Sequence, residues 1–176
     1  MTIEIPNLPR TKIELKTARI LCLGNSGIGK TAIIKAISDP RNVFDGTGDG
    51  SSTTVDFFAV NAQINASTIR RFCFFDTGGT DSLSHLRTEL LHDAEAILMF
   101  YSDKASFLAL ECRWMLEAKD VIGKIPLIIC CIKPTTVPER QATSWVESKK
   151  LIHVSCSTQD TAPLLKVLID TFRVTK

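Results

Sequence analysis

The stretch Gly24-Asn25-Ser26-Gly27-Ile28-Gly29-Lys30-Thr31 decides the fold of this chain. It matches the pattern GxxxxGK[ST] and lies between a β-prone apolar run at residues 18–23 and a segment with helical spacing at residues 31–37. A strand, a glycine-rich turn and a helix in this order are typical of a phosphate-binding loop. A glycine-rich turn that matches by accident is the alternative, and the strand-to-helix context argues against it.

The residue types in this motif fit phosphate chemistry. The glycines let the backbone approach the anion closely, and the amide groups at the helix N-terminus attract it. Lys30 adds positive charge, and the hydroxyl of Thr31 is a ligand for Mg²⁺. The residues expected to bind a nucleotide here are Asn25, Ser26, Gly27, Ile28, Gly29, Lys30, Thr31 and Ala32.

A second motif, Asp76-Thr77-Gly78-Gly79, follows the β-prone run at residues 69–75. A phosphate loop needs a carboxylate near the metal and a sensor of the terminal phosphate, both at the end of a neighbouring strand. We expect Asp76 to be the metal ligand and the backbone N–H of Gly79 to approach the γ-phosphate. An ordinary Asp-Gly turn would be the better interpretation in isolation, but the phosphate loop upstream favours the nucleotide site.

Apolar runs and amphipathic stretches alternate along the rest of the chain. Parallel strands that are joined by crossover helices need helices on both faces of the sheet, so the fold class is α/β. The two runs after the polar loop at residues 39–54 predict a hairpin. Strands are expected at residues 55–62, 69–75, 96–101, 126–132 and 151–154, and helices within residues 83–91, 107–121, around Trp145 and within 164–172.

Two apolar stripes on the expected helices allow different interpretations. The first is equally consistent with a core face and with a partner-binding face; it comprises Leu83, Leu86, Leu90 and Leu91. The second is more typical of the core; it comprises Phe107, Leu110, Trp114 and Met115.

The composition indicates one compact domain. The chain has 176 residues, of which 44% are hydrophobic, and a mean hydropathy of +0.12, so it can bury a sizeable core. We expect an N-terminal arm over residues 1–16 and a single domain over residues 17–176. The six cysteines lie mostly in apolar runs, which predicts buried, reduced thiols.

Charge and targeting signals exclude several classes of protein. Lys and Arg number 21 against 19 Asp and Glu, a formal net charge of +2, which disfavours nucleic acid as a partner. The chain has no apolar stretch of about 18 residues, no secretory leader and no C-terminal Cys for a prenyl group. We therefore expect a cytoplasmic protein with no encoded membrane anchor.

The segments GNSGIGKT, SSTTVDFF and FFDTGGTD resemble the first nucleotide motifs of Ras-superfamily small GTPases, most closely the divergent Rab-like branch. The resemblance implies a three-layer P-loop NTPase fold, with a six-stranded, mostly parallel sheet, one antiparallel edge strand and about five helices. It implies Mg²⁺ and GTP or GDP as cofactors, and switch segments at residues 39–54 and 77–92. Ser52, Thr53 and Thr54 compete to supply the switch hydroxyl for Mg²⁺, and we assign Thr54 beside Thr31 and Asp76.

The departures from the family pattern predict weaker hydrolysis and weaker base selection. Thr80 replaces the Gln that orients the attacking water, so we expect slow turnover. The guanine motif NKxD is reduced to Lys133, with Thr135 in the place of the carboxylate, which leaves ATP or ADP possible. In place of the last motif, Ser155 and Cys156 can still offer a backbone N–H to the base.

This combination of motifs is similar to the Rab-like small GTPase subunit of intraflagellar transport complex B. That similarity implies a protein partner bound through the switch regions, a coiled-coil pair of a ciliary transport complex, and a location in the cilium or flagellum. Three functions stay open: a nucleotide-dependent interaction subunit, which we favour; a cycling GTPase of vesicle or cytoskeletal trafficking; and a pseudo-GTPase that serves as a structural subunit.

Overall fold

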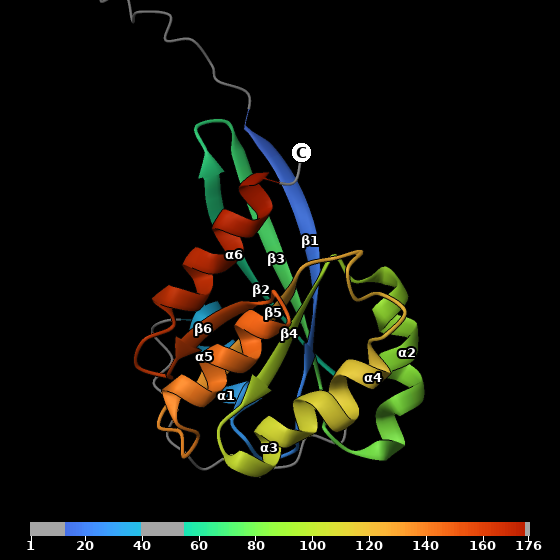
Figure 1. The fold of residues 1–176 in the computed structure, drawn as a ribbon. Coiled ribbons are helices and arrows are strands. Elements are labelled where there is room, and N and C mark those ends of the chain that lie inside the picture. The colour runs from blue at the N-terminus through green and yellow to red at the C-terminus, as the bar shows by residue number, and fades with distance from the viewer. Residues whose placement is uncertain (1–12, 40–54, 175–176) are drawn as a thin grey trace, which may run out of the picture.

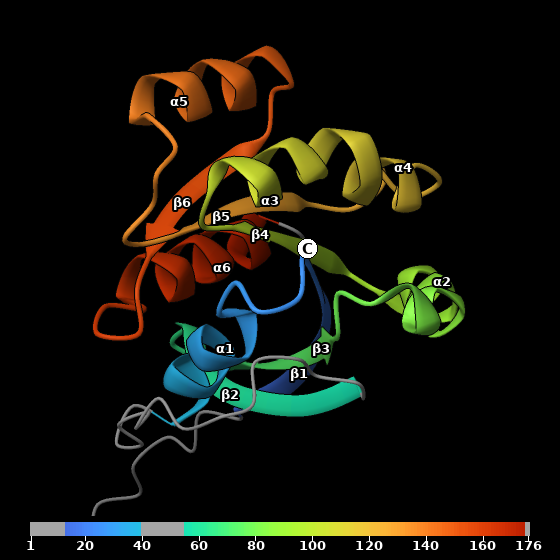
Figure 2. The same cartoon turned by 90° about the horizontal axis from the view of Figure 1, so that it is seen from below.

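The computed structural model describes residues 13–39 and 55–174, which form a sheet with helices on both faces (Figures 1 and 2). The strands are β1 (Glu14–Leu23), β2 (Val55–Asn65), β3 (Thr68–Thr77), β4 (Ala96–Tyr101), β5 (Leu127–Ile132) and β6 (Ile152–Cys156). The helices are α1 (Lys30–Ser38), α2 (Ser84–Asp93), α3 (Lys104–Ala109), α4 (Met115–Glu117), α5 (Glu139–Ser148) and α6 (Ala162–Val174).

The six strands pair in the order β2-β3-β1-β4-β5-β6. The edge strand β2 runs antiparallel to β3, and the other pairs are parallel. Every residue of β4 and β5 is buried, which is why these segments are continuous apolar runs rather than alternating ones. The expected α/β fold with one antiparallel edge strand is confirmed.

Each face of the sheet is covered by its own set of helices (Figure 2). On one face, α1 and α6 contribute Ile33, Ile34 and Leu168 to a core that includes Ile20 of β1. On the other face, α2, α3 and α5 pack against the alternate residues of the strands, such as Leu21. The alternation along β1 therefore divides its side chains between two cores.

The long helical segment over β4 carries the stripe that the sequence assigned to the core. It begins at Asp103, whose side chain accepts a hydrogen bond from the N–H of Ser106 in a capping box. It continues from α3 through a π-helical stretch, Leu110–Trp114, into α4. Phe107, Leu110 and Trp114 are buried, as predicted. If α3, the π-helical stretch and α4 are counted as one helix, the described residues contain the five α-helices that were expected.

Some boundaries differ from those expected. β1 begins at Glu14, four residues before the predicted start, because β3 offers pairing partners as far as Thr68; residues 14–16 of the expected arm thus lie in a strand. The stripe on α2 is split: Leu83 and Leu91 are buried, whereas Leu86 is 43% exposed. Five cysteines are buried, but Cys112 is exposed.

None of the helices in the described ranges is long and apolar enough to cross a membrane.

Candidate functional site

The turn between β1 and α1 forms the phosphate loop expected from the sequence. Gly24, Gly27 and Gly29 have φ angles of 148°, 75° and 96°, which residues with a side chain rarely adopt. A Cβ at Gly24 would also lie 2.8 Å from the carbonyl oxygen of Phe100. Gly29 caps α1 without a side-chain hydrogen bond, so the first N–H groups of the helix are left to bind an anion. Ser26, at the tip of the loop, is exposed to solvent.

Lys30 is the first residue of α1, and its side chain folds back into the loop. Its Nζ donates to the carbonyl oxygens of Gly24, at 2.9 Å, and Asn25, at 2.8 Å. Burial lowers the pKa of Lys30 from its ordinary value, and the negative charge of Asp76 opposes that change. The ammonium is therefore held beside the loop by its own backbone, where phosphate oxygens can replace the carbonyls.

Asp76 and Thr31 meet at the ends of β3 and α1. Asp76 is fully buried, and its Oδ2 accepts a hydrogen bond from the hydroxyl of Thr31. Its other oxygen, Oδ1, is buried with no hydrogen-bond partner in the described part of the chain, and burial raises the pKa of the carboxyl. An orphaned carboxylate oxygen beside a hydroxyl is a donor set that suits Mg²⁺. The residues present fit this ion.

Gly79 packs directly on the phosphate loop. A Cβ at this position would lie 2.3 Å from the nitrogen of Ser26 and 2.6 Å from the carbonyl oxygen of Gly24, distances that no side chain tolerates. The neighbouring Thr77 donates its hydroxyl proton to the carbonyl oxygen of Cys22, at 2.9 Å, and so holds the end of β3 to β1. The structure thus brings the two motifs into contact.

Thr80 follows this contact and is half-buried. Its hydroxyl lies 3.0 Å from that of Ser82, within its own turn. Ile28 and Ala32, also assigned from the sequence, are half-buried, and Ile28 packs against the core between the sheet and α1. Thr54 lies outside the described residues.

The residues that the sequence assigns to the base end, Lys133, Ser155 and Cys156, line a hollow of about 180 Å³ at the ends of β5 and β6. The N–H of Lys133 donates to the carbonyl oxygen of Cys156, at 2.8 Å, and joins the two strand ends. Thr135 does not line the hollow; its hydroxyl oxygen accepts the N–H of Val137, at 3.2 Å. The lining consists of Lys133, Ser155, Cys156, Ser157 and Asp160.

Sequence reasoning did not identify two contributors to the site. Asp160, in the loop before α6, lines the hollow; its position four residues after Cys156 is the only available signal. Trp114 was assigned to the core, yet its Nε1–H donates to the Oδ1 of Asn25 in the phosphate loop, at 2.9 Å. Nothing in local sequence spacing indicates a contact between residues this far apart.

A family model matches residues 19–134, more than half of the 176-residue chain. Its description is "Ras of Complex, Roc, domain of DAPkinase". The matched range includes the phosphate loop, Asp76, Gly79 and Lys133, whereas β6 and the loop after it, which supply the rest of the hollow, lie outside this range.

The chain is also similar to larger proteins. DnaJ homolog subfamily C member 27 of Rattus norvegicus is 27% identical over 168 residues, which cover 87% of this chain and 60% of the relative. Ciliogenesis and planar polarity effector 2 of Homo sapiens is 27% identical over 154 residues, which cover 82% of this chain and 60% of that protein. The chain therefore spans about 60% of the length of these relatives.

Proposed function

The chain belongs to the Roc family of Ras-like GTPase domains, and from this premise we propose that it is a Mg²⁺-dependent guanine nucleotide-binding subunit whose bound nucleotide governs a protein partner. The observation that carries the proposal is the pairing of Thr31 with Asp76, whose buried Oδ1 has no partner among the described residues. Mg²⁺ at these oxygens would neutralise charge on the β- and γ-phosphates. Lys30 and the free N–H groups of α1 would bind the phosphate oxygens.

We propose that hydrolysis is slow. The hydroxyl of Thr80 is shorter than the Gln amide that orients water in the family, and it lies against Ser82 in its own turn. Thr80→Gln should raise the single-turnover rate of GTP hydrolysis roughly tenfold. Ser82→Ala serves as the control, because it frees the Thr80 hydroxyl without adding a group that reaches water. An unchanged rate in Thr80→Gln would show that another feature limits hydrolysis.

Base selection is proposed to be modest. Thr135 stands where the family has a carboxylate, and its hydroxyl is engaged with Val137. Lys133 can cover the face of the base with its stem, and the N–H groups near Cys156 can meet the base oxygen. We therefore expect ATP to bind only moderately more weakly than GTP, and competition between the two nucleotides measures the difference. Identifying the nucleotide that co-purifies with the protein tests this preference directly.

The proposed partner is a coiled-coil pair in a ciliary transport complex, with the protein acting in the cytoplasm and cilium. One relative is named as an effector of ciliogenesis and planar polarity, which supports this setting. Two exposed apolar side chains near the switch regions, Phe57 on β2 and Leu86 on α2, are available to a helical partner.

A pull-down from ciliated cells tests the partner proposal. The Lys30→Ala variant should lose partners that depend on nucleotide, and Leu86→Ala should lose those that bind the α2 face. Leu108→Ala is the matched control, because Leu108 on α3 is also exposed, at 63%, but lies outside the switch segments. Recovery of the same partners by all variants would instead favour the pseudo-GTPase, a structural subunit. Multiple turnover with an activator would favour the cycling GTPase.

A further inference from the structure

We propose that an arginine–tryptophan cluster, made of the buried Arg87 and Trp114 and the half-buried Arg113, positions the turn at residues 78–80 so that the N–H of Gly79 faces the phosphate loop. The three side chains come from α2 and from the π-helical stretch, and none belongs to a recognised nucleotide motif. This inference rests on the proposed function in one respect, that Gly79 reads the terminal phosphate.

Arg87 is the centre of the cluster. Its side chain is fully buried, and its Nη1 donates to the carbonyl oxygens of Gly78, at 2.8 Å, and Thr80, at 2.9 Å. Its Nε and Nη2 bind the carboxylate of Glu117 on α4. A buried guanidinium is tolerated only where its donors are satisfied. Here most of them are satisfied by the turn itself and by one carboxylate.

Arg113 completes the set of donors. Its Nη2 donates to the carbonyl oxygen of Gly79, at 3.0 Å, and to Asp81 Oδ1, at 2.6 Å. The carbonyls of three consecutive residues, Gly78, Gly79 and Thr80, thus each accept a hydrogen bond from an arginine. Such a turn cannot rotate a peptide group without breaking a charge-assisted hydrogen bond.

The direction of the Gly79 N–H follows from peptide geometry. In a planar trans peptide the C=O of one residue and the N–H of the next point in opposite directions. Because the C=O of Gly78 points to Arg87, the N–H of Gly79 points away from α2. The contact of Gly79 with Ser26 and Gly24 puts the phosphate loop next to this turn. Arg87 therefore acts on the sensor through the peptide that precedes it.

Trp114 links the arginines to the phosphate loop. Its ring centroid lies 4.3 Å from the Cζ of Arg113 and 5.3 Å from that of Arg87, so both cations contact one indole. The same ring donates its Nε1–H to Asn25 Oδ1 in the loop. Both Arg113 and Trp114 lie in the π-helical stretch, a feature that is frequent at functional sites. The cluster thus spans from the loop to the sensor turn.

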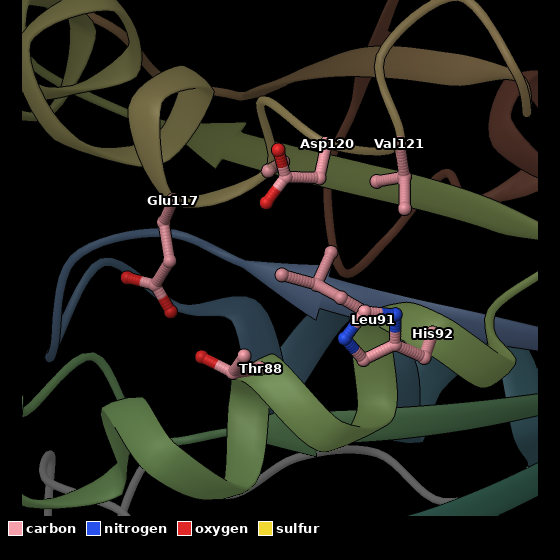
Figure 3. Close-up of a pocket in the computed structure, with 7 residues that line it drawn as sticks. Thr88, Leu91, His92, Glu117, Asp120 and Val121 are labelled. Carbon is pink, nitrogen blue, oxygen red and sulfur yellow. The ribbon is translucent and has the colours of Figure 1, made fainter.

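The Arg87–Glu117 ion pair lies at the seam between α2 and α4. Glu117 lines a small hollow at this seam, with room for about one water in its 20 Å³ (Figure 3). Thr88, Leu91 and His92 of α2 face it from the opposite side (Figure 3). Loss of the Arg87–Glu117 pair should therefore release the turn and α2 without opening the main core.

Arg87→Lys is the variant that tests the proposal, because lysine keeps the charge but lacks the fork that reaches two carbonyls and a carboxylate. Arg113→Ala is a second variant with less risk to folding, since that side chain is 34% exposed. Arg71→Lys on β3 is the matched control, because Arg71 is exposed and donates to the side chain of Asn61. Thermal unfolding establishes that each variant is folded.

Two measurements decide the outcome. In the presence of Mg²⁺, calorimetry should show that both cluster variants lose roughly tenfold in affinity for a non-hydrolysable GTP analogue while their affinity for GDP is unchanged. In the nucleotide-free protein, amide hydrogen exchange at residues 79–81 should accelerate roughly tenfold in both variants and stay unchanged in Arg71→Lys. Unchanged exchange at these amides in a folded Arg87→Lys protein would overturn the positioning role.

The two measurements separate this inference from the proposed function. A wild-type protein that binds neither nucleotide would refute the proposed function, and the exchange data would still decide whether the cluster holds the turn. Equal losses for GDP and the GTP analogue would mean that the cluster supports the phosphate loop as a whole, and the specific role at Gly79 would be wrong.

Discussion

The phosphate end and the base end of the site differ in how firmly the chain holds them. At the phosphate end, Lys30, Asp76 and Gly79 are fixed by hydrogen bonds or by backbone contacts that leave no space for a Cβ. At the base end, Lys133 and Asp160 are exposed side chains around an open hollow. The phosphate loop is therefore preorganised, whereas the side chains around the open hollow would have to be ordered when a ligand binds.

The two ends also differ in their departures from the family pattern. Every position of the phosphate loop carries a residue that the motif requires, while the base end has lost the carboxylate at Thr135. The loop that matches its motif at every position is thus also the part of the site that is held most firmly by its own contacts. Substitutions at that end should have the larger effects, and variants at both ends test this order.

Lys30→Ala should have the largest effect. It removes a buried ammonium that would bind phosphate oxygens, and charge-assisted hydrogen bonds contribute about 1.5–3 kcal/mol each, so triphosphate affinity should fall by at least about 100-fold. Calorimetry with GTP and Mg²⁺ measures the loss. Lys35→Ala, an exposed lysine on the same helix, is the control and should bind normally. Equal affinity in Lys30→Ala and wild type would place the phosphates elsewhere.

Gly79→Ala should have the next largest effect. The added Cβ would collide with the backbone of Ser26 and Gly24, and overpacking of this kind costs about 1–3 kcal/mol in the free energy of unfolding. Chemical denaturation of the nucleotide-free protein measures that cost. The preference for GTP over GDP should fall as well, because the turn must move away from the loop. Gly123→Ala is the control for this preference, because its φ of 82° strains an alanine locally while nothing lies within 4 Å of the added Cβ, so the preference should stay intact.

The sequence predicted the phosphate end well because its determinants are local. GNSGIGKT carries its own turn geometry, and Asp76 follows directly from the end of an apolar strand. The start of β1 was placed late, because residues 14–17 are exposed, three of them are polar, and they are held by pairing with β3 rather than by burial. Local hydrophobic patterns predict buried strands better than exposed strand ends that are held only by backbone pairing.

The contacts that the sequence could not predict join residues far apart in the chain. Trp114 has the spacing of a core residue and is buried like one, so its bond to Asn25, 89 positions away, leaves no trace in the pattern. Arg87 lies on a helix of mainly polar residues, where a charged side chain is expected in solvent, yet it is fully buried. Asp160 likewise acquires its place at the hollow only through the pairing of β5 with β6.

Asp160→Asn should have a moderate effect and probes the base end alone. Asp160 lines the hollow, where a carboxylate would supply the acceptor missing at Thr135, so we expect the preference for GTP over ATP to fall by roughly tenfold, or about 1.4 kcal/mol. Competition binding measures the ratio. Asp170→Asn, an exposed carboxylate on α6 paired with Arg173, is the charge-matched control.

A second variant sharpens the same test. Thr135→Asp should raise the GTP preference less than Asp160→Asn lowers it, because position 135 bonds to its own turn and does not line the hollow. If Thr135→Asp raises the preference while Asp160→Asn leaves it unchanged, the base is read from the family position. Asp160 would then have no part in selecting the base.

The smallest expected effect is a pH dependence at the base end. His153 on β6 shares a hydrogen bond with the hydroxyl of Tyr101, at 3.1 Å, and burial, followed by the positive charge of Lys133, lowers the pKa of its imidazole. The pKa of His153 in the folded protein lies below its unfolded value of about 6.5. At pH values between these two pKa values, the unfolded state therefore binds more protons than the folded state. The free energy of unfolding should therefore be undiminished above about pH 6.5 and should decrease as the pH falls from there through the folded pKa.

His153→Gln isolates this contribution. Denaturation at a series of pH values should show a smaller loss of stability toward acid in His153→Gln than in wild type, by less than about 1 kcal/mol, since the ring is partly screened by solvent. Lys133→Met should raise the pKa of His153 part of the way back toward its ordinary value, because it removes a positive charge that repels the protonated ring. If Lys133→Met leaves the pH dependence of stability unchanged, solvent screens the exposed Lys133 from His153. The charge of Lys133 would then have little effect on its surroundings, unlike that of the buried Lys30.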